Sequence, residues 1–518
     1  MNLAAGLASA ARRWPTSPAI ARGTRVVHDY ATFARRVAAL ADSMRSAGLA
    51  RGDRVALVSR NSGDYLEALY ACWWAGLCAV PVNAKLHPAE LGFVLGDAGV
   101  RVAFVDVAWA SALGGVQRDL QLIGLGGADY RRWLDGGAPG EADAAARDTP
   151  AWLFYTSGTT GRPKGVVLSH GNLAAMTEAF VANVETIAPG DAILHPAPLS
   201  HGSGLYAIPH VAHGAVQVVP ESGGFDAAET AMLMAHWPRA LFFAAPTMVK
   251  RLVRDGDPAS RDLARFKCLV FGGGPMYVAD LREAFAALGP RLAQIYGQGE
   301  SPMTITAMRR EEVADAIARS DDARLASVGR AQSGIALRIG TAMSESAAGE
   351  PGEILVQGAT VMQGYWNNPA ATQATLAGGW LHTGDVGTLD AEGYLTLLDR
   401  SKDLVISGGS NIYPREVEEV LQAHPAVAEV AVVGRAHPEW GEELVACLVL
   451  REGADESTVT RECDALCLAR IARFKRPKAY VLTDALPKNN AGKIVKTEVR
   501  AMVAARARGD AKKSEAGR

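Results

Sequence analysis

A loop rich in glycine and hydroxyl residues spans 155–165 and has the sequence YTSGTTGRPKG. It follows the apolar run AWLF, which is typical of a buried strand, and it contains one lysine. Glycine lets backbone N–H groups approach an anion closely, and the hydroxyl groups add further donors. The loop differs from a Walker A motif, because Gly158 and Gly161 are too close together and no G-K-[ST] follows. The loop therefore predicts a cradle for the β- and γ-phosphates of a nucleotide.

Three further segments place reactive or backbone-exposing residues where predicted strands end: PLSHGSG (198–204), FGGGPM (271–276) and QIYGQGE (294–300). A fourth segment, HTGD (382–385), contains a carboxylate. In open α/β sheets, ligands bind beyond the carboxyl ends of the strands. A histidine there could orient a carboxylate, and a carboxylate suits a hard cation such as Mg²⁺. The alternatives are a structural loop histidine at His201 and an ordinary turn at HTGD.

The elements that must position these segments follow two patterns. Up to about 340, strands alternate with helices, which indicates a parallel, helix-covered sheet. Beyond it, GEILVQGATVMQGYW and TLDAEGYLTLLDR indicate antiparallel strands with a tight turn at 390–393. A helix over REVEEVLQAHP and two apolar strands then predict a small α+β unit, with the junction near 399–402. The small, polar and charged residues from about 505 predict a disordered tail.

Composition limits the class of protein. A chain of 518 residues exceeds one usual core, so we expect at least two domains. The net charge of −2 does not favour nucleic acid as a partner. Six cysteines are too few for a disulfide scaffold and predict reduced, partly buried thiols. No run of 18 apolar residues predicts a membrane span, and the N-terminal segment suits an amphipathic helix better than a signal peptide, so we expect a cytoplasmic protein.

Together, these segments resemble the adenylate-forming superfamily, which includes acyl-CoA synthetases, adenylation domains and beetle luciferases. YTSGTTGRPKG is similar to its signature loop, and the other motifs follow in the family's order over nearly the whole chain. The resemblance implies an α/β fold: a large N-terminal domain with two helix-covered sheets and a small antiparallel barrel-like sheet, and a small mobile α+β domain. It also implies a two-step reaction, in which a carboxylate attacks the α-phosphate of ATP·Mg and a thiol then displaces AMP.

The resemblance assigns the nucleotide site residue by residue. Tyr296 would stack on adenine, Gln294 would read its amino group, Asp385 would accept hydrogen bonds from the ribose hydroxyls, and Glu300 would help to hold Mg²⁺. The residues that it assigns to ATP or AMP are Thr156, Ser157, Gly158, Thr159, Thr160, Gly161, Lys164, Gly273, Gly274, Pro275, Gln294, Tyr296, Gly297, Asp385 and Arg400. One departure is Gly299, where the family usually has a threonine. The alternative of a catalytically inactive homologue stays open at this point.

The small domain would supply the remaining groups. The implied boundaries are 1–399 for the AMP-binding domain, 400–402 for the hinge with Lys402, 403–504 for the mobile domain and 505–518 for the tail. In the motif PKNNAGKIVK, Lys493 would bridge the attacking carboxylate and the α-phosphate, because two anions must meet there. The residues assigned to CoA are Gly408, Gly409, Trp440, Phe474 and Lys475, with Lys478 near the same surface. The segment 470–518, with 14 basic and 4 acidic residues, fits either a polyphosphate surface or a solvated tail.

The strips that would line the acid pocket are 201–205, 242–247, 272–277 and 296–304. Apart from His201, Glu300 is the one acidic or basic residue in them. No cation is present for a second carboxylate, so we expect a monocarboxylic acid. Glycine removes side-chain bulk and apolar residues supply surface, which favours a medium or long fatty acid or a bulky aryl acid. The residues assigned to the acyl pocket are His201, Phe243, Gly272, Gly297 and Met303.

The partners expected are therefore a small carboxylic acid, ATP and CoA, with Mg²⁺ as cofactor, and no nucleic acid or spanning membrane segment. One rival function is an adenylation enzyme that loads the phosphopantetheine thiol of a carrier protein. A second rival, from another class, is a non-catalytic nucleotide sensor or scaffold. The oligomeric state stays open, with a homodimer as one option.

Overall fold

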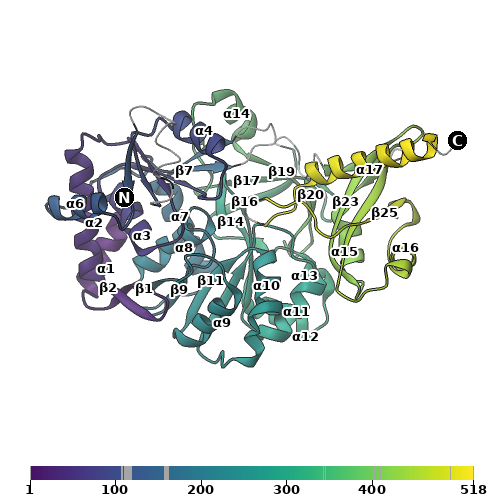
Figure 1. Ribbon diagram of the computed structural model, residues 1–518, viewed down its shortest axis with the longest axis horizontal. Coiled ribbons are helices and arrows are strands. Elements are labelled where there is room, and N and C mark those ends of the chain that lie inside the picture. Colours follow the sequence, from purple (N-terminus) through teal and green to yellow (C-terminus); the bar gives the residue numbers. More distant parts are fainter. Residues whose placement is uncertain are drawn as a thin grey trace.

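The computed structural model describes residues 2–106, 109, 120–156, 163–341, 344, 346–400, 403–407, 410–489 and 492–516. Figure 1 shows a large body, which is formed by residues up to about 400, and a smaller unit at one side, which is formed by the C-terminal residues. The two large sheets expected from the resemblance are both present, as are the small antiparallel sheet and the α+β unit. The predicted fold class is thus confirmed.

The first large sheet has the strand order β18-β8-β7-β4-β3-β5-β6 among the described residues. Its strands are β3 (Arg54–Val58), β4 (Cys78–Val82), β5 (Val102–Val105), β6 (Gln121–Gly124), β7 (Pro150–Thr156), β8 (Lys164–Ser169) and β18 (Gly364–Tyr365). The second has the order β15-β14-β13-β12-β11-β9-β10-β1-β2. Its strands are β1 (Pro18–Arg22), β2 (Arg25–Asp29), β9 (Ala192–Leu194), β10 (Val216–Val219), β11 (Ala240–Ala244), β12 (Phe266–Phe271), β13 (Leu292–Gln298), β14 (Ser301–Met308) and β15 (Arg330–Ala331).

The sequence predicts parallel, helix-covered sheets, whereas both large sheets are mixed and also contain antiparallel pairs. β7 pairs with β8, β13 with β14 and β1 with β2 in antiparallel fashion. The reason is the length of the connections. β13 ends at Gln298 and β14 begins at Ser301, and a link of two residues permits a hairpin but no crossover to a parallel neighbour. The β7–β8 and β13–β14 pairs include residues of the predicted nucleotide segments.

Helices cover the sheets and fill the space between them (Figure 1). They are α1 (Ala4–Arg13), α2 (Tyr30–Ser46), α3 (Gly63–Trp74), α4 (Pro88–Ala98), α6 (Ala128–Gly136), α7 (His170–Asn183), α8 (Gly202–Ala212), α9 (Ala227–His236), α10 (Pro246–Gly256), α11 (Val278–Leu288), α12 (Arg310–Ala318), α13 (Asp322–Ala326) and α14 (Pro369–Thr375). α1 ends before Pro15, as the sequence predicts. One core cluster includes residues of both sheets, such as Leu57 and Leu241, together with Tyr206 of α8. α8 is apolar and buried nearly all round, which is typical of a helix inside a core, and its first residue follows His201.

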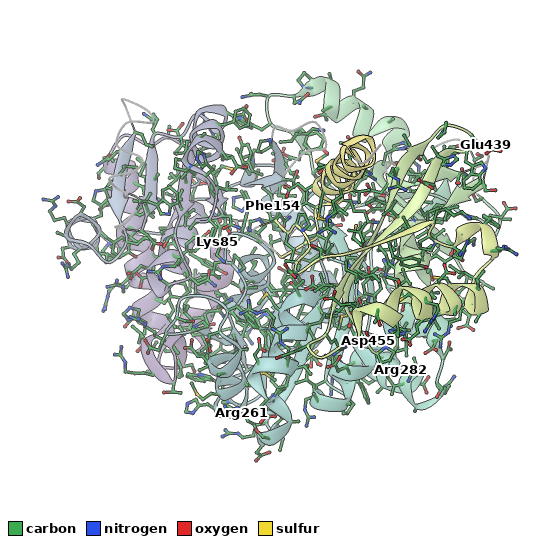
Figure 2. The ribbon with its side chains drawn as sticks, turned by 45° about the vertical axis from the view of Figure 1, so that its right-hand side comes forward. Lys85, Phe154, Arg261, Arg282, Glu439 and Asp455 are labelled. Atoms are coloured by element: carbon green, nitrogen blue, oxygen red, sulfur yellow. The ribbon has the colours of Figure 1, made fainter. Side chains whose placement is uncertain are left out.

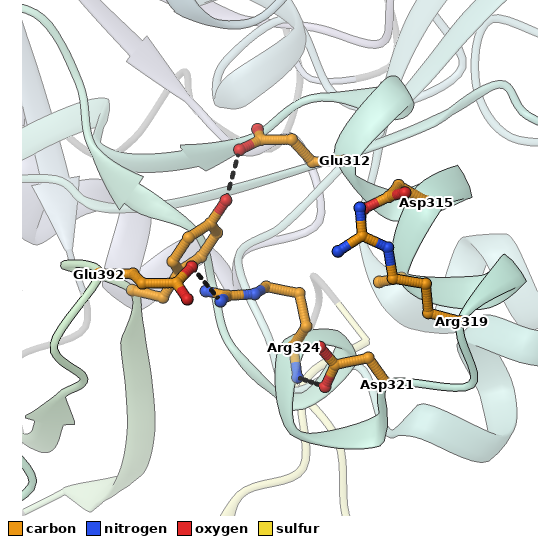
Figure 3. A pocket seen from close by; sticks show the side chains of 8 residues that line it. Glu312, Asp315, Arg319, Asp321, Arg324 and Glu392 are labelled. Carbon is orange, nitrogen blue, oxygen red and sulfur yellow. Dashed lines mark hydrogen bonds and ion pairs between the residues drawn. The ribbon is translucent and has the colours of Figure 1, made fainter.

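The small antiparallel sheet has the order β16-β17-β19-β20. Its strands are β16 (Ile335–Gly340), β17 (Gly352–Gly358), β19 (Leu381–Leu389) and β20 (Leu395–Arg400). β19 and β20 form the hairpin that the sequence predicts around 390–393. A polar surface pocket beside this hairpin is lined by α12, α13 and the β19–β20 turn, and its charged groups already pair with one another, as Arg324 does with Glu392 at 2.7 Å (Figure 3).

The C-terminal unit contains β21 (Val405–Ser407), β22 (Ser410–Ile412), α15 (Pro414–Gln422), β23 (Val427–His437), β24 (Gly441–Leu450), α16 (Glu456–Arg470), β25 (Ala479–Leu482) and α17 (Lys496–Ala516). α17 extends away from the large body (Figure 1). α17 extends to Ala516, within the stretch 505–518 for which the sequence predicts a disordered tail. Alanine, arginine, lysine and glutamate dominate this stretch, and these are strong helix formers.

All six cysteines are free, as predicted, and all of them are buried. No helix among the described residues is both long and apolar enough to cross a bilayer.

Candidate active site

The predicted nucleoside residues converge where β13 meets the small antiparallel sheet. The Tyr296 hydroxyl donates to Oδ2 of Asp385 at 2.7 Å, and Gln298 Nε2 donates to the same oxygen at 2.6 Å. Asp385 is 8% exposed. A carboxylate has about four acceptor positions, so it keeps capacity for a ligand after these two bonds. Asp385 is also the strand partner of Arg400, which brings the backbone of Arg400 beside this carboxylate.

Gln294 lies on the same strand, two residues before Tyr296, and is 4% exposed. Its Oε1 accepts no hydrogen bond from any residue that the structure describes. A buried amide oxygen without a donor costs free energy unless a ligand or water satisfies it. The oxygen therefore fits the exocyclic amino group of a purine, which is the role that the resemblance assigns to Gln294.

The glycines of the segment 271–276 give the backbone access to this place. Gly273 has φ of +79°, a conformation that favours glycine. A Cβ atom built on Gly272 would lie 2.5 Å from the carbonyl oxygen of Ile295, so the two neighbouring strand ends touch there. A Cβ atom built on Gly297 would likewise lie 2.7 Å from the backbone nitrogen of Met303. Gly274 and Pro275 follow in the same loop, directly after β12.

Glu300 occupies the β13–β14 turn, and its Oε1 accepts a hydrogen bond of 2.7 Å from the Tyr365 hydroxyl. Burial, and next the negative charge of Glu300, raise the pKa of Tyr365, so the tyrosine stays a donor. Lys164 Nζ lies 4.8 Å from the centre of the Tyr365 ring, a cation–π distance. Tyr365 thus joins the predicted metal carboxylate to the lysine of the phosphate loop. The sequence reasoning did not find Tyr365 or Gln298, although Gln298 lies inside a motif that it quoted.

A single carboxylate fits Mg²⁺, because this ion is usually held by one or two carboxylates together with substrate phosphates. Among the described residues, no group of three or more His, Cys, Asp or Glu side chains could form an all-protein site. Glu300 therefore suits an ion that is shared with a nucleotide.

Gly299, the departure from the family pattern, faces β7. A Cβ atom built there would lie 2.6 Å from Cγ2 of Thr156 and 3.1 Å from Phe154. The space that a threonine would need is thus filled by the strand that leads into the phosphate loop. The remaining residues predicted in that loop, Ser157, Gly158, Thr159, Thr160 and Gly161, lie outside the described residues.

The predicted acyl residues also come together. The His201 ring lies edge-on to Phe154, with the ring centres 5.3 Å apart, and Ser200 Oγ lies 2.8 Å from His201 Nδ1. Burial lowers the pKa of His201 to about 4, so the ring is neutral at pH 7. Phe243 and Met303 flank Gly202, whose Cβ atom would lie 2.7 Å and 3.1 Å from them.

The loop that carries Lys493 contacts the large body. A Cβ atom on Gly492 would lie 2.7 Å from Oγ1 of Thr247, at the start of α10. β11, which carries Phe243, ends directly before α10, so the loop lies at the same sheet edge as the acyl residues. The Lys493 amide donates to Oδ1 of Asn489 at 2.9 Å, and its side chain is exposed.

The predicted CoA residues are on the small unit. Trp440 is 37% exposed and stacks on His437 at 4.4 Å, with Lys478 Nζ 5.3 Å from its ring centre. Phe474 is 49% exposed, while Lys475 forms an ion pair of 2.7 Å with Glu416. Lys402, Gly408 and Gly409 lie outside the described residues.

Comparisons with known proteins agree with this geometry. Residues 7–366 match the AMP-binding enzyme family, and residues 416–493 match the AMP-binding enzyme C-terminal domain. A feruloyl-CoA synthase from Amycolatopsis sp. is 35% identical and covers 95% of this chain and 96% of its own length. The fatty acid–[acyl-carrier-protein] ligase ScoC of Streptomyces coeruleorubidus is 32% identical, with 95% and 94% covered.

Among solved structures, ATP-bound MatB from Rhodopseudomonas palustris superimposes with a TM-score of 0.86 and 29% identity, covering 97% of this chain and 99% of that one. The orphaned amide of Gln294, the carboxylate of Asp385 and these matches have one explanation. The chain belongs to the AMP-binding enzyme family, within the acyl-CoA synthetase branch of the adenylate-forming superfamily.

Proposed function

We propose that this protein is an AMP-forming acid–CoA ligase for a monocarboxylic acid of medium or long chain length or with a bulky aryl group. The observation that carries the proposal is the convergence at one sheet edge of the Gln294 amide, the Asp385 carboxylate and the loop of Lys493. An amide for adenine, a carboxylate for ribose and an ammonium group for the reacting anions suit an ATP whose α-phosphate meets a carboxylate.

In the first step, the substrate carboxylate attacks the α-phosphate, the P–O bond to the β-phosphate breaks, and pyrophosphate leaves. Negative charge builds on the phosphate oxygens, and an ammonium group near them reduces the repulsion. Lys493 would supply that charge from the small unit. Bound at Glu300, Mg²⁺ would supply further positive charge to the phosphates. The neutral His201 would orient the acid without adding charge.

In the second step, a thiol attacks the acyl carbonyl and AMP leaves. The C-terminal unit contacts the large body through the Lys493 loop, so a thiol needs another path or another orientation of this unit. Rotation of residues 403–504 about a hinge at 400–402 would withdraw Lys493 and open that path. Trp440 and Phe474, both exposed aromatic rings with lysines beside them, suit the adenine and phosphates of CoA.

The class of substrate acid is inferred from the residues assigned to the acyl pocket. Phe243 and Met303 provide apolar surface, and both side chains pack closely against Gly202. A second carboxylate would be buried there without a cation, which is costly. A monocarboxylic acid is therefore favoured, and the named activities of the relatives, on ferulate in one case and on fatty acids in another, include both remaining substrate classes.

The second candidate is loading of a carrier protein, which the ScoC relative supports by name. The exposed aromatic and basic residues near Trp440 favour CoA, because a carrier-protein thiol brings no adenine to stack there.

One screen tests the proposal. Pyrophosphate release is measured with ATP and a panel of short, medium, long and aromatic acids, and the products are then offered CoA or a phosphopantetheinylated carrier protein. We expect acid-dependent release for long or aromatic acids and transfer to CoA. Release that does not depend on any acid would contradict the proposed function, and transfer only to the carrier would establish the second candidate.

A further inference from the structure

A buried ion-pair network lies next to the Lys493 loop. Lys496 is the first residue of α17, three positions after Lys493, and its Nζ lies 3.0 Å from Asp399 Oδ2 and 3.2 Å from Glu418 Oε1. The Lys496 side chain is 17% exposed, and its partners are 7% and 3% exposed. Burial opposes the charge of Lys496, but the charges of Glu418 and Asp399 outweigh it and raise its pKa. The lysine is therefore a permanent buried cation between two carboxylates.

This network crosses from the small unit to the large body. Asp399 belongs to β20 of the large body, whereas Glu418 and Lys496 belong to the small unit. Glu418 Oε2 also accepts a hydrogen bond of 3.1 Å from the hydroxyl of Tyr277, which precedes α11 of the large body. The neighbouring Glu419 accepts one of 2.7 Å from the Val278 amide at the start of α11. Glu419 thus meets the positive end of the α11 dipole, while Glu418 binds the side chain of the residue before that helix.

The loop that carries Lys493 leads directly into this network. The Val495 amide donates to the Pro487 carbonyl at 2.9 Å, and the Asn489 amide donates to the Lys493 carbonyl at 2.9 Å. These bonds close residues 487–495 into one loop, and Lys496 follows it directly. The place of Lys493 therefore depends on where the Lys496 side chain is anchored.

We propose that Lys496 and Tyr277 are positioning residues, which hold the small unit in the orientation that presents Lys493 for adenylate formation. The inference rests on the proposed function and adds the contacts that select its first step. The Tyr277–Glu418 bond joins the two parts directly, so rotation for thiol transfer must break it. Removing it should slow the first half-reaction and leave the second unchanged.

The sharpest variant is Tyr277→Phe, which removes one hydroxyl group and no charge. We expect acyl-adenylate formation, measured as pyrophosphate release in a single turnover without CoA, to slow roughly two- to tenfold, since one hydrogen bond is lost. Thioester formation from supplied acyl-adenylate and CoA should keep its rate. The matched control is Tyr480→Phe, because the Tyr480 hydroxyl bonds Asp464 within the small unit. It should change neither half-reaction.

Substitutions of Lys496 test whether its positive charge is needed. Lys496→Met should slow the first half-reaction more than Tyr277→Phe does, since it leaves Asp399 and Glu418 without their cation, and Lys496→Arg should restore it. If Lys496→Met fails to fold, by thermal melting, Tyr277→Phe decides the question. Equal slowing of both half-reactions in Tyr277→Phe would overturn the proposal.

A direct measurement of orientation needs no turnover. Arg451 of the small unit and Glu283 of the large body are exposed and lie 3.6 Å apart at their charged atoms. Figure 2 labels Arg282, which precedes Glu283 in the sequence, and Asp455, which belongs to the same unit as Arg451. Glu283→Cys and Arg451→Cys provide a pair for a short bismaleimide, because the six native cysteines are buried. We expect Tyr277→Phe to lower the cross-linking rate at least twofold, and an unchanged rate would overturn the proposal. If the unmodified enzyme shows no acid-dependent release of pyrophosphate, the proposed function is contradicted instead. The cross-linking rate would still report on the contact between the small unit and the large body.

Discussion

Replacement of Asp385 by asparagine tests the proposed ribose contact with almost no change in shape. In the structure, one oxygen of Asp385 accepts two hydrogen bonds, from Tyr296 and Gln298, at 2.7 Å and 2.6 Å. Asparagine keeps one oxygen and exchanges the other for an NH₂ group, which only donates. If its oxygen serves Tyr296 and Gln298, its NH₂ group faces the ribose. If its oxygen faces the ribose, two protein donors meet a donor.

Either arrangement loses at least one hydrogen bond to a charged acceptor. Such a bond contributes about 1.5–3 kcal/mol, which corresponds to roughly 10- to 150-fold weaker binding of AMP. The KM for ATP should rise in parallel. The KM for the acid should change little, because Asp385 lies on the nucleoside side of the site.

Calorimetric titration of the unmodified enzyme and of Asp385→Asn with AMP and with 2′-deoxy-AMP tests this contact, because it compares two proteins with two ligands. The unmodified enzyme should bind 2′-deoxy-AMP more weakly than AMP, and Asp385→Asn should reduce or abolish that difference. Glu353→Gln, at a carboxylate that pairs with His382 on the same small sheet, is the matched control and should preserve AMP binding. An undiminished preference for AMP in Asp385→Asn would refute the assignment of this carboxylate to the ribose.

Three further predictions concern Lys493, the buried His195 and Trp440. Lys493→Ala should lower single-turnover pyrophosphate release at least 100-fold and spare thioester formation from supplied acyl-adenylate. The control Lys488→Ala, in the same loop, should leave both half-reactions unchanged. Equal loss of both half-reactions in Lys493→Ala would contradict a role in one step. Burial lowers the pKa of His195 to about 4, below its ordinary value of 6.5. The unfolded chain therefore binds more protons, and the stability of the fold should fall as pH drops from about 6.5 toward 4. The midpoint of urea unfolding should fall with pH, and it should fall less in His195→Gln; an equal dependence on pH in both proteins would contradict the prediction. Trp440→Ala should raise the KM for CoA about tenfold, as one lost stacking contact predicts, without changing adenylate formation, and an unchanged KM would remove Trp440 from the CoA surface.

Much of the architecture could be predicted because local patterns determine it. Alternating strands and helices up to about 340 and the hairpin around 390–393 follow from hydrophobic periodicity and turn residues. The errors arose where composition or pattern gave no information on pairing. The direction of β8 and β14 depends on the chain connections that precede them, which leave no signature in hydrophobic periodicity.

The sequence by itself predicted the chemistry proposed for this protein, since its motifs resemble those of a known family, and this resemblance assigned roles to His201, Glu300, Asp385 and Lys493. Only the tertiary structure decided what surrounds them. Tyr365 reaches Glu300 from 65 positions away, and Lys496 reaches Asp399 from 97. Such contacts leave no local pattern, because they arise from the packing of elements that are distant in the chain. The residues that carry charge could therefore be predicted, whereas the residues that hold them in place could not.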